Sequence, residues 1–597
     1  MQILRAYFYL MARHRWAYAL GGGSLLLTNG LALAIPRVLG WAVDALSQGT
    51  TRSILISYGA TIMILAVVQT LTRVGSRIWI LSISRRIDYQ LKGMMHDHLM
   101  RLAPSFFSAV STGDLMSRMT NDIMLVRALG GPGVLYFFNA VLLYVMGLGY
   151  MLSINWRLAL IVFVPLPLMA WFVRGLVQKA KEYATGSRIA LADLNTMVQE
   201  NLNGVQVVKS FALEDAQCRR FEELSEVYVD WNLKEALTRA KMVPLVGLSG
   251  GIATLAVLGI GARMVAGGSL TLGDLVAFFS YIGILVFPTV ALGWILSLIQ
   301  RGAAALERLD AVLKAPITIS SPQKTESSPP TPAAVRTTDL TVRYDDALAR
   351  YHAIFGPTDD QEGGRRAALE NVDFEADAGG FVALVGKVGS GKSTLLKAVI
   401  RLVEVPVGSV FLDGIDVTEL DLADLRRQIG YVPQDDFLFS SSLAANIAYG
   451  RPGSGAEEIE DAAEIAGLVS DLARMPEGLD TVVGERGLTL SGGQRQRVAL
   501  ARALLPAPAI MVLDNALSNI DSDTERTILD RLHSSRQSCT LIVSSNRISA
   551  VRDADRIYVM DMGRVVDVGR HEELIQRPGL YADMHEQQKL SAELERL

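Results

Sequence analysis

The chain has 597 residues, of which 50% are hydrophobic and 20% are charged, and its formal net charge at pH 7 is −4. This length predicts more than one domain, and a mean hydropathy of +0.29 is too apolar for an ordinary soluble enzyme. The weak negative charge argues against a general nucleic-acid-binding protein, because such proteins are usually strongly basic. The two cysteines, Cys218 and Cys539, lie far apart and outside any CxxC or Cys/His cluster. They predict two ordinary buried or partly buried thiols, with no disulfide framework or zinc site.

Six apolar runs in the first 310 residues predict six membrane helices. A spanning helix needs about 20 apolar residues, and buried helices of a soluble protein would rarely show six runs with almost no charge. The basic N-terminus is followed by further spans and by no small-residue cleavage site, so no cleavable signal peptide is predicted. The runs lie near 17–35, 54–72, 128–151, 158–173, 243–262 and 275–300.

Basic flanking residues predict that the N-terminus is cytoplasmic. Arg13 and Arg15 precede the first run, and the connections after the second and fourth runs are long and rich in Arg and Lys. An even number of spans then returns the chain to the cytoplasm. Apolar residues at helical spacing in 84–102 and 195–237 predict helices that continue beyond the bilayer.

A linker rich in Pro, Ser and Thr is predicted at residues 315–336. After it, strand-like runs such as FVALVG (381–386) and IMVLD (510–514) alternate with helical stretches, as in a soluble α/β domain. We therefore expect a multidomain membrane protein, with a six-helix, all-α transmembrane domain at 1–314 and an α/β domain at 337–597.

The stretch GKVGSGKST follows a strand-like run and precedes a helical one, which is the context of a phosphate-binding P-loop. Its glycines let backbone N–H groups close around phosphates, and the next helix N-terminus favours an anion. Lys392 can reach the β- and γ-phosphates, and Ser393 can ligate Mg²⁺, so the motif predicts binding of ATP with Mg²⁺. The predicted binding residues are Gly386, Lys387, Val388, Gly389, Ser390, Gly391, Lys392, Ser393 and Thr394.

A second glycine-rich loop, LSGGQ, lies about 100 residues further on and precedes a basic helix. Because one nucleotide needs no second loop of this kind, we expect it to serve a site on another subunit. Beside the P-loop, this signature makes the chain resemble a half-transporter of the ABC exporter family over essentially its full length. The resemblance implies a type IV exporter fold and a P-loop ATPase domain of the ABC type. The signature residues are Leu490, Ser491, Gly492, Gly493 and Gln494.

The resemblance also assigns roles at the ATP site. Tyr344 resembles the aromatic residue that stacks on adenine, and Tyr351 is the reserve candidate because 345–366 is longer and more polar than the family's usual connection. Gln434 and Asp514 resemble the residues that hold Mg²⁺ together with Ser393. Four further segments resemble two intracellular loops that dock on the nucleotide domains, the loop before the signature and the dimer-facing loop. They are 106–123, 204–221, 481–487 and 518–521.

Two departures from the family pattern fall in the hydrolytic step. Asn515 stands where the family has its catalytic glutamate, and Asn546 stands where a histidine contacts the γ-phosphate. Loss of a positioned base costs about 10²–10⁴-fold in rate. The alternative is that one catalytic residue has been replaced during evolution and that a nearby residue such as Asp521 or Asp523 takes over its role. An inactivating laboratory change at Asn515 would leave Asn546 unexplained.

In this family each ATP lies between one chain's P-loop and the other chain's signature. The resemblance therefore implies a degenerate site in this chain, and a different half-transporter as partner that carries the competent site. The expected function is ATP-driven export of hydrophobic or amphipathic substrates across the inner (plasma) membrane of a bacterial cell. An importer on the same fold, for example for a siderophore, and a nucleotide-gated subunit that does not pump are the alternatives.

Polar and aromatic residues of the spans give the remaining candidates. Arg37, Asp44 and Arg263 lie near predicted outer helix ends, where a structural or interfacial role is expected instead of a functional one. Aromatic and amide residues of the third and sixth spans are candidates for an amphipathic cavity, although lipid contact or packing is the commoner role. They are Tyr136, Phe137, Phe138, Asn139, Phe278, Phe279, Tyr281 and Phe287.

Overall fold

The structure is a computed structural model in which the chain forms two compact units. One unit comprises residues 1–95 and 116–314, and the other comprises 96–115 and 315–597. The second unit therefore contains a short piece of the first long connection. The structure describes all residues other than 1–6, 8, 10, 164, 323–332, 356–366, 485, 486, 488, 535–538 and 595–597.

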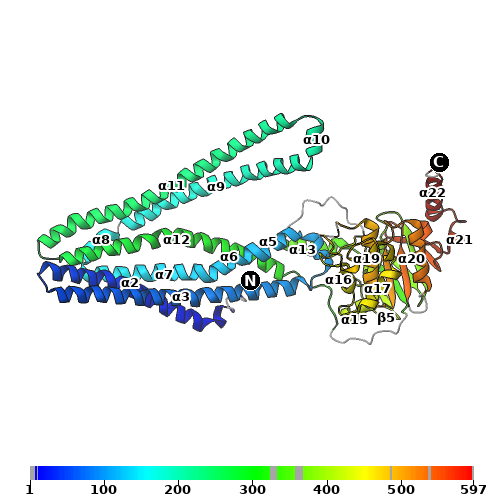
Figure 1. The fold of residues 1–597 in the computed structure, drawn as a ribbon, viewed down its shortest axis with the longest axis horizontal. Coiled ribbons are helices and arrows are strands. Elements are labelled where there is room, and N and C mark those ends of the chain that lie inside the picture. Colours follow the sequence, from blue (N-terminus) through cyan, green and yellow to red (C-terminus); the bar gives the residue numbers. More distant parts are fainter. Residues whose placement is uncertain are drawn as a thin grey trace. The chain divides into compact units, whose positions relative to one another are not determined.

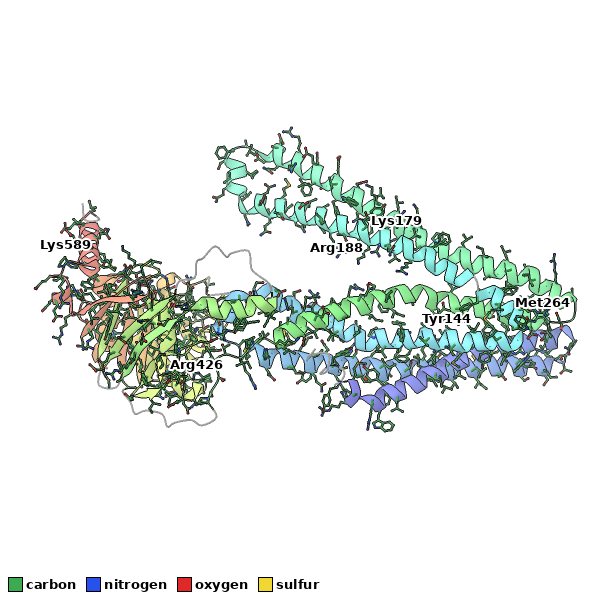
Figure 2. The ribbon with its side chains drawn as sticks, turned by 180° about the vertical axis from the view of Figure 1, so that it is seen from behind. Tyr144, Lys179, Arg188, Met264, Arg426 and Lys589 are labelled. Carbon is green, nitrogen blue, oxygen red and sulfur yellow. The ribbon has the colours of Figure 1, made fainter. Side chains whose placement is uncertain are left out.

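The first unit is helical. Helices α9 and α11 run side by side as a long hairpin with α10 at its tip (Figure 1). Charged side chains such as Lys179 and Arg188 lie along α9 (Figure 2), as expected for a helix that continues into water. The elements are α2 (Arg15–Ser47), α3 (Arg52–Leu99), α5 (Thr112–Ser117), η1 (Arg118–Asp122), α6 (Ile123–Ala128), η2 (Leu129–Gly133), α7 (Val134–Ile154), α8 (Trp156–Phe163), α9 (Pro165–Asn203), α10 (Val205–Ser210), α11 (Glu214–Ala266) and α12 (Leu272–Leu313).

The predicted apolar runs fall in these helices, apart from residue 164, which lies outside the described part of the chain. Within that part, three helical stretches are long and apolar enough to cross a membrane: Arg15–Ser47, Arg52–Leu99 and Thr112–Ile154. Two shorter apolar helices, Gly250–Ala266 and Leu272–Val286, belong to α11 and α12. Both long connections are helical, as their spacing predicts.

Helices α2 and α12 pack closely at one end of the unit. A Cβ on Gly40 would lie 2.6 Å from the Gly273 carbonyl oxygen, so the two backbones meet where neither residue has a side chain. Arg37 forms an ion pair with Asp274. Asp44 accepts hydrogen bonds from the Thr271 hydroxyl over 2.8 Å and the Gly273 amide over 2.7 Å. The structural role expected for Arg37 and Asp44 is therefore confirmed.

The second unit contains two sheets. The larger has the order β10-β9-β3-β8-β7-β6, and its strands from β9 to β6 are parallel. Strands β3, β7 and β8 are buried along their whole length, as parallel strands covered on both faces are. The smaller sheet, β2-β1-β4-β5, is antiparallel. The strands are β1 (Val335–Val342), β2 (Leu369–Ala376), β3 (Phe381–Gly386), β4 (Val410–Leu412), β5 (Ile415–Asp416), β6 (Ile429–Val432), β7 (Ile510–Asp514), β8 (Thr540–Ser544), β9 (Arg556–Asp561) and β10 (Arg564–Gly569).

The helices of this unit cover the sheets. The predicted strands FVALVG and IMVLD are β3 and β7, and the helix predicted after the P-loop is α14. The elements are α4 (Pro104–Ala109), α13 (Tyr344–Phe355), α14 (Lys392–Val399), α15 (Leu422–Arg427), α16 (Leu443–Ala448), α17 (Ala456–Ile465), α18 (Val469–Leu472), η3 (Gly478–Asp480), α19 (Gly492–Leu504), α20 (Ser522–Ser534), η5 (Ile548–Ala550), α21 (His571–Leu574) and α22 (Leu580–Leu594).

Candidate functional site

A pocket of about 200 Å³ lies at the carboxyl ends of β3, β7 and β8, the edge at which parallel sheets usually hold ligands. It brings together Ala368 before β2, the P-loop, Gln434 after β6, the end of β7 and the end of β8, so five separate segments of the sequence meet there. Its lining residues are Ala368, Val388, Gly389, Ser390, Gly391, Lys392, Ser393, Thr394, Gln434, Asp514, Asn515, Ser544 and Asn546.

The P-loop backbone requires glycine at two positions. A Cβ on Gly386 would lie 2.1 Å from the Met560 carbonyl oxygen, and one on Gly391, whose φ is +102°, would lie 2.8 Å from the Ala368 carbonyl oxygen. The Lys392 ammonium is buried and donates to the carbonyl oxygens of Gly386 (2.7 Å) and Lys387 (3.0 Å). Burial lowers the pKa of Lys392, while the Asp514 carboxylate opposes that shift.

Asp514 is the centre of a small polar cluster. Its Oδ1 accepts hydrogen bonds from the hydroxyls of Ser393 over 2.9 Å and Ser544 over 2.7 Å. The carboxylate is only 2% exposed, so both hydroxyls compensate for its burial. Burial, followed by the charge of Asp514, raises the pKa of the neighbouring Tyr431 hydroxyl. Sequence reasoning missed Ser544, although it ends a buried strand in register with Asp514.

The two departures from the family pattern line the same pocket as the P-loop. Asn515 has φ +50°, a left-handed conformation that asparagine adopts more readily than most residues. The backbone N–H of Asn515 donates to the Ser544 carbonyl oxygen over 3.0 Å and to the Ser544 hydroxyl oxygen over 3.1 Å. The Oδ1 atom of Asn546 is buried and has no hydrogen-bond partner among the described residues. Neither Asp521 nor Asp523 lines the pocket.

Tyr344 lies beside the P-loop helix without lining the pocket. Its hydroxyl donates to the Thr394 hydroxyl over 3.4 Å, and its half-buried ring packs against the core of the antiparallel sheet. Tyr351, the reserve candidate, is fully buried, does not line this pocket and packs against Phe106. Of the two tyrosines, Tyr344 lies nearer the P-loop helix, so its position fits the predicted adenine contact better than that of Tyr351.

The signature residues Leu490 to Gln494 lie outside the pocket lining. Ser491 is the N-cap of α19. Its hydroxyl accepts from the Gln494 backbone N–H over 3.2 Å, and the Gln494 side-chain oxygen accepts from the Ser491 backbone N–H over 2.9 Å. This capping box holds the loop at a helix N-terminus. A Cβ on Gly493 would lie 2.9 Å from the Asn519 carbonyl oxygen, so the loop packs closely on the predicted dimer-facing loop.

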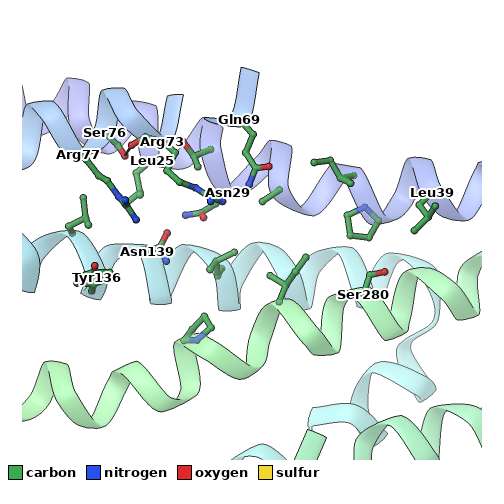
Figure 3. A pocket seen from close by; sticks show the side chains of 18 residues that line it. Leu25, Asn29, Leu39, Gln69, Arg73, Ser76, Arg77, Tyr136, Asn139 and Ser280 are labelled. Atoms are coloured by element: carbon green, nitrogen blue, oxygen red, sulfur yellow. Dashed lines mark hydrogen bonds between the residues drawn. The ribbon is translucent and has the colours of Figure 1, made fainter. Parts of the chain in front are cut away.

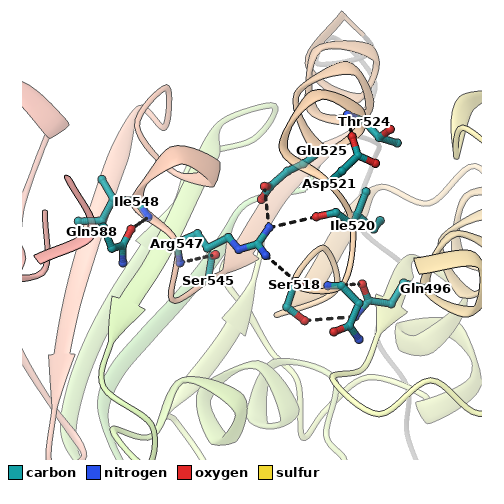
Figure 4. A network of polar contacts seen from close by, with 11 residues as sticks. Gln496, Ser518, Ile520, Asp521, Thr524, Glu525, Ser545, Arg547, Ile548 and Gln588 are labelled. Carbon is teal, nitrogen blue, oxygen red and sulfur yellow. Dashed lines mark hydrogen bonds and ion pairs between the residues drawn. The ribbon is translucent and has the colours of Figure 1, made fainter. Parts of the chain in front are cut away.

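The segment that holds Asn546 is tied to the loop that follows Asn515 (Figure 4). The Arg547 guanidinium donates to the carbonyl oxygens of Ser518 over 2.9 Å and Ile520 over 3.1 Å, and it contacts Glu525 at 3.4 Å. On the other side of that loop, the Gln496 amide donates to the Ser518 hydroxyl over 3.3 Å. Residues 518–521 are therefore held from both sides. In the loop before the signature, Glu485 and Arg486 lie outside the described residues.

A second pocket, of about 530 Å³, lies within the helical unit between α2, α3, α7 and α12. Apolar side chains line most of it, and Arg73, Arg77, Asn29 and Asn139 point toward a common space (Figure 3). Neither guanidinium has an ion-pair partner among the described residues, and no acidic side chain lines the pocket there. The sequence prediction missed both arginines, because they follow the end of the apolar run at residue 72.

The residues predicted to line an amphipathic cavity are only partly brought together. Tyr136 and Asn139 line the second pocket, whereas Phe278 and Tyr281 are fully buried in helix packing. Phe137 and Phe138 are exposed, as lipid-facing residues would be. Phe279 packs on the helical core without lining the pocket, and the Phe287 side chain lies outside the described part of the chain.

The cysteine prediction was partly wrong. Cys539 is partly buried, and burial raises the pKa of its thiol to about 11. Cys218 is exposed because it lies on the hairpin helix α11, which packs mainly on α9 and leaves much of its surface uncovered.

Two family models match the chain. A model of the ABC transporter transmembrane region matches residues 18–289, and a second model, described as ABC transporter, matches 369–518. The multidrug resistance-like ATP-binding protein MdlA of Escherichia coli (strain K12) is 36% identical over 98% of this chain and 96% of its own length. The ATP-dependent lipid A-core flippase of Aromatoleum aromaticum is 34% identical over 88% of this chain and 84% of its own length.

A solved structure has the same fold. A bacterial Atm1-family ABC exporter with ATP bound superposes with a TM-score of 0.75 at 26% identity, over 97% of this chain and 98% of that one. Both family matches belong to ATPase-coupled transporters, and they cover the membrane-spanning helices and part of the α/β domain. The chain therefore belongs to the ABC transporter family, with the exporter fold in which one polypeptide joins a membrane-spanning region to an ATPase domain.

Proposed function

We propose that this chain binds ATP at a site that hydrolyses it very slowly, and that it forms one half of a heterodimeric exporter. One observation carries this proposal: Asn515 and Asn546 line the same pocket as Lys392, Ser393 and Asp514. The phosphate-binding residues and the two amides are therefore parts of one site, and the substitutions fall beside the position of the reacting phosphate.

The pocket offers no second carboxylate to activate water. Among the described residues that line it, Asp514 is the only acidic side chain, and there is no histidine. Asp514 already accepts two hydroxyl hydrogen bonds through one oxygen. An amide cannot take a proton at neutral pH, so Asn515 can orient water without acting as a general base. Asp521, the alternative base, accepts from the Thr524 amide over 2.9 Å outside the pocket.

The pocket chemistry fits Mg²⁺ together with ATP. A carboxylate, a hydroxyl and an amide oxygen are hard oxygen donors of the kind that Mg²⁺ prefers. Asp514, Ser393 and Gln434 supply these groups within one pocket. When bound, the ion would neutralise phosphate charge, and Lys392 would contact the phosphates directly.

The signature loop supports a role for a second chain. Leu490 to Gln494 are held at a helix N-terminus and do not line this chain's own pocket, so they are free to face a nucleotide on another subunit. A homodimer would combine two sites that both lack the base. A different half-transporter that retains the glutamate and histidine would supply one competent site.

The pocket in the helical unit supports an amphipathic substrate. Apolar side chains surround two arginines and two asparagines, so a lipid-like compound with an anionic group would satisfy both kinds of surface. Relatives of this chain are named as multidrug resistance proteins and as lipid A-core flippases. We assign export across the inner membrane of a bacterial cell, with residues 1–314 as the membrane domain and 337–597 and both termini in the cytoplasm.

The proposal is tested on the complex of this chain with its partner half-transporter, by steady-state ATPase measurements. Gly493→Asp should nearly abolish turnover, because any side chain there blocks approach of the signature loop to the partner's nucleotide. Asn515→Ala should lower turnover much less, because the site that contains Asn515 hydrolyses ATP only very slowly. ATP binding is measured separately for both variants. If Asn515→Ala lowered turnover as much as Gly493→Asp while ATP binding stayed intact, the assignment of hydrolysis to the partner's site would be contradicted.

Two measurements separate the alternatives that share this fold. Transport in inside-out vesicles gives the direction, and uptake instead of export would favour an importer. Undiminished nucleotide-stimulated flux without hydrolysis would favour a gated subunit that does not pump.

A further inference from the structure

Helix α13 lies between β1 and β2 and outside both family matches, which cover 18–289 and 369–518. Its first residue is Tyr344, and Tyr351 and Phe355 follow at spacings of seven and four. Residues at these spacings lie on one face of a helix, with about 10 Å along the axis between Tyr344 and Tyr351. One face of α13 therefore presents three aromatic residues in a row.

The far end of this face packs on α4. The Phe106 ring lies 5.3 Å from the Tyr351 ring at an interplanar angle of 79°, and 5.7 Å from the Phe355 ring at 71°. Both are edge-to-face contacts, an arrangement that aromatic pairs prefer over a face-to-face sandwich. Phe106 and Tyr351 are completely buried. The Tyr351 hydroxyl has no hydrogen-bond partner among the described residues, so its ring makes the contact.

The near end of the same face lies at the P-loop. Tyr344 donates to the Thr394 hydroxyl, one residue after the predicted Mg²⁺ ligand Ser393. Between the two ends, the Arg350 guanidinium pairs with Glu404 over 2.7 Å, which holds the middle of α13 on the nucleotide domain. A rigid helix thus connects the first predicted intracellular loop, where α4 lies, with the predicted adenine contact.

We propose that the contact of Phe106 with Tyr351 and Phe355 sets the position of Tyr344, and that these three are positioning residues for adenine binding at this chain's ATP site. The inference rests on the proposed function, in which Tyr344 stacks on adenine. Because binding linkage is reciprocal, adenine in turn stabilises this contact. The occupancy of a site that does not hydrolyse its ATP is thereby signalled to the first intracellular loop.

The experiment compares ATP with inorganic triphosphate, both with Mg²⁺, as ligands of the full chain in its complex. Triphosphate occupies the P-loop without an adenine. Phe106→Ala and Tyr351→Ala should weaken ATP binding at this site about three- to tenfold and leave triphosphate binding unchanged. Tyr351→Phe should retain wild-type affinity, because it keeps the ring. Tyr89→Ala, which truncates an exposed aromatic residue on α3, is the control.

A double-mutant cycle tests whether Phe106 acts on ATP binding through Tyr344. If Phe106 acts through Tyr344, adding Phe106→Ala to Tyr344→Ala should cost almost no further ATP affinity. Additive losses would overturn the proposal, and so would equal losses for ATP and triphosphate, which indicate general damage to the site. Normal ATP affinity of Phe106→Ala, together with weakened ATP affinity of Tyr344→Ala, would overturn the positioning role of this contact and leave the adenine assignment of Tyr344 intact. Normal affinity in Tyr344→Ala would instead contradict the adenine assignment of the proposed function.

Discussion

The Arg547 guanidinium donates a hydrogen bond to the Ser518 carbonyl oxygen over 2.9 Å. This bond joins the residue next to Asn546 to the loop that follows Asn515, so the two departures from the family pattern share one support. Arg547 also compensates the charge of Glu525, a buried carboxyl. Burial raises the pKa of Glu525, and the positive charge of Arg547 opposes that shift.

Replacing Arg547 should destabilise the nucleotide domain. Arg547→Ala removes two bonds to carbonyl oxygens and leaves Glu525 buried without its cation, at a cost of about 2–4 kcal/mol. Thermal unfolding of the full chain should show a midpoint lowered by several degrees. Arg552→Ala is the control, because Arg552 pairs only loosely with exposed Asp553, at 3.7 Å. Equal midpoints for the two variants would contradict the supporting role of Arg547.

Removing the Ser544 hydroxyl should weaken Mg²⁺-dependent ATP binding. Ser544→Ala deprives Asp514 of one of its two hydroxyl donors, and a hydrogen bond to a charged group contributes about 1.5–3 kcal/mol. We expect a loss of about tenfold or more in ATP affinity with Mg²⁺ and a smaller loss with EDTA. Ser545→Ala, one residue on and outside the pocket lining, is the comparison. Identical losses with Mg²⁺ and with EDTA would show that Ser544 does not act through the ion site.

The arginines of the transmembrane pocket should decide which amphiphiles stimulate the ATPase. Dodecyl phosphate should stimulate the complex more than dodecyl maltoside or dodecyltrimethylammonium, which share its chain length. Arg73→Gln with Arg77→Gln should remove that preference. Arg85→Gln, on the same helix but outside the pocket lining, should leave it intact. A preference for the cationic amphiphile would contradict the anionic class of substrate, while leaving ATP-driven transport untouched.

The two thiols should differ strongly in reactivity. The pKa of Cys539 is raised to about 11, so little of it is thiolate at pH 8, and its partial burial limits access. Cys218 is exposed. Iodoacetamide at pH 8 should therefore modify Cys218 and spare Cys539, and the Cys539 reaction should accelerate as the pH rises toward 11. Peptide mass spectrometry over time measures both, and equal rates at pH 8 would show that Cys539 is more open than the fold indicates.

The sequence predicted most of the architecture because its signals are local. Apolar runs locate the membrane helices, and the P-loop motif locates the β3–α14 turn to the residue. Ser544 and Arg547 carry no such signal, since their roles come from neighbours more than 25 residues away. Arg73 and Arg77 were missed because composition ends the membrane run at residue 72, whereas α3 continues to Leu99.

Helix α13 shows a different limit. The stretch after Tyr344 reads as a polar insertion, yet Tyr351 and Phe355 complete an apolar face that packs on Phe106 of α4. Residue 106 lies about 240 positions earlier, so no window of sequence contains both partners. The same applies to the degenerate pocket, where only the fold places Asn515 and Asn546 beside Lys392.

The central claim is that this chain binds ATP but hydrolyses it very slowly, and ATPase activity of the purified lone chain tests this most directly. ATP binding is measured in parallel, with Lys392→Ala as the control for an intact P-loop. The account predicts clear, Lys392-dependent ATP binding with hydrolysis barely above background. Robust turnover by the lone chain that Lys392→Ala abolishes would contradict it.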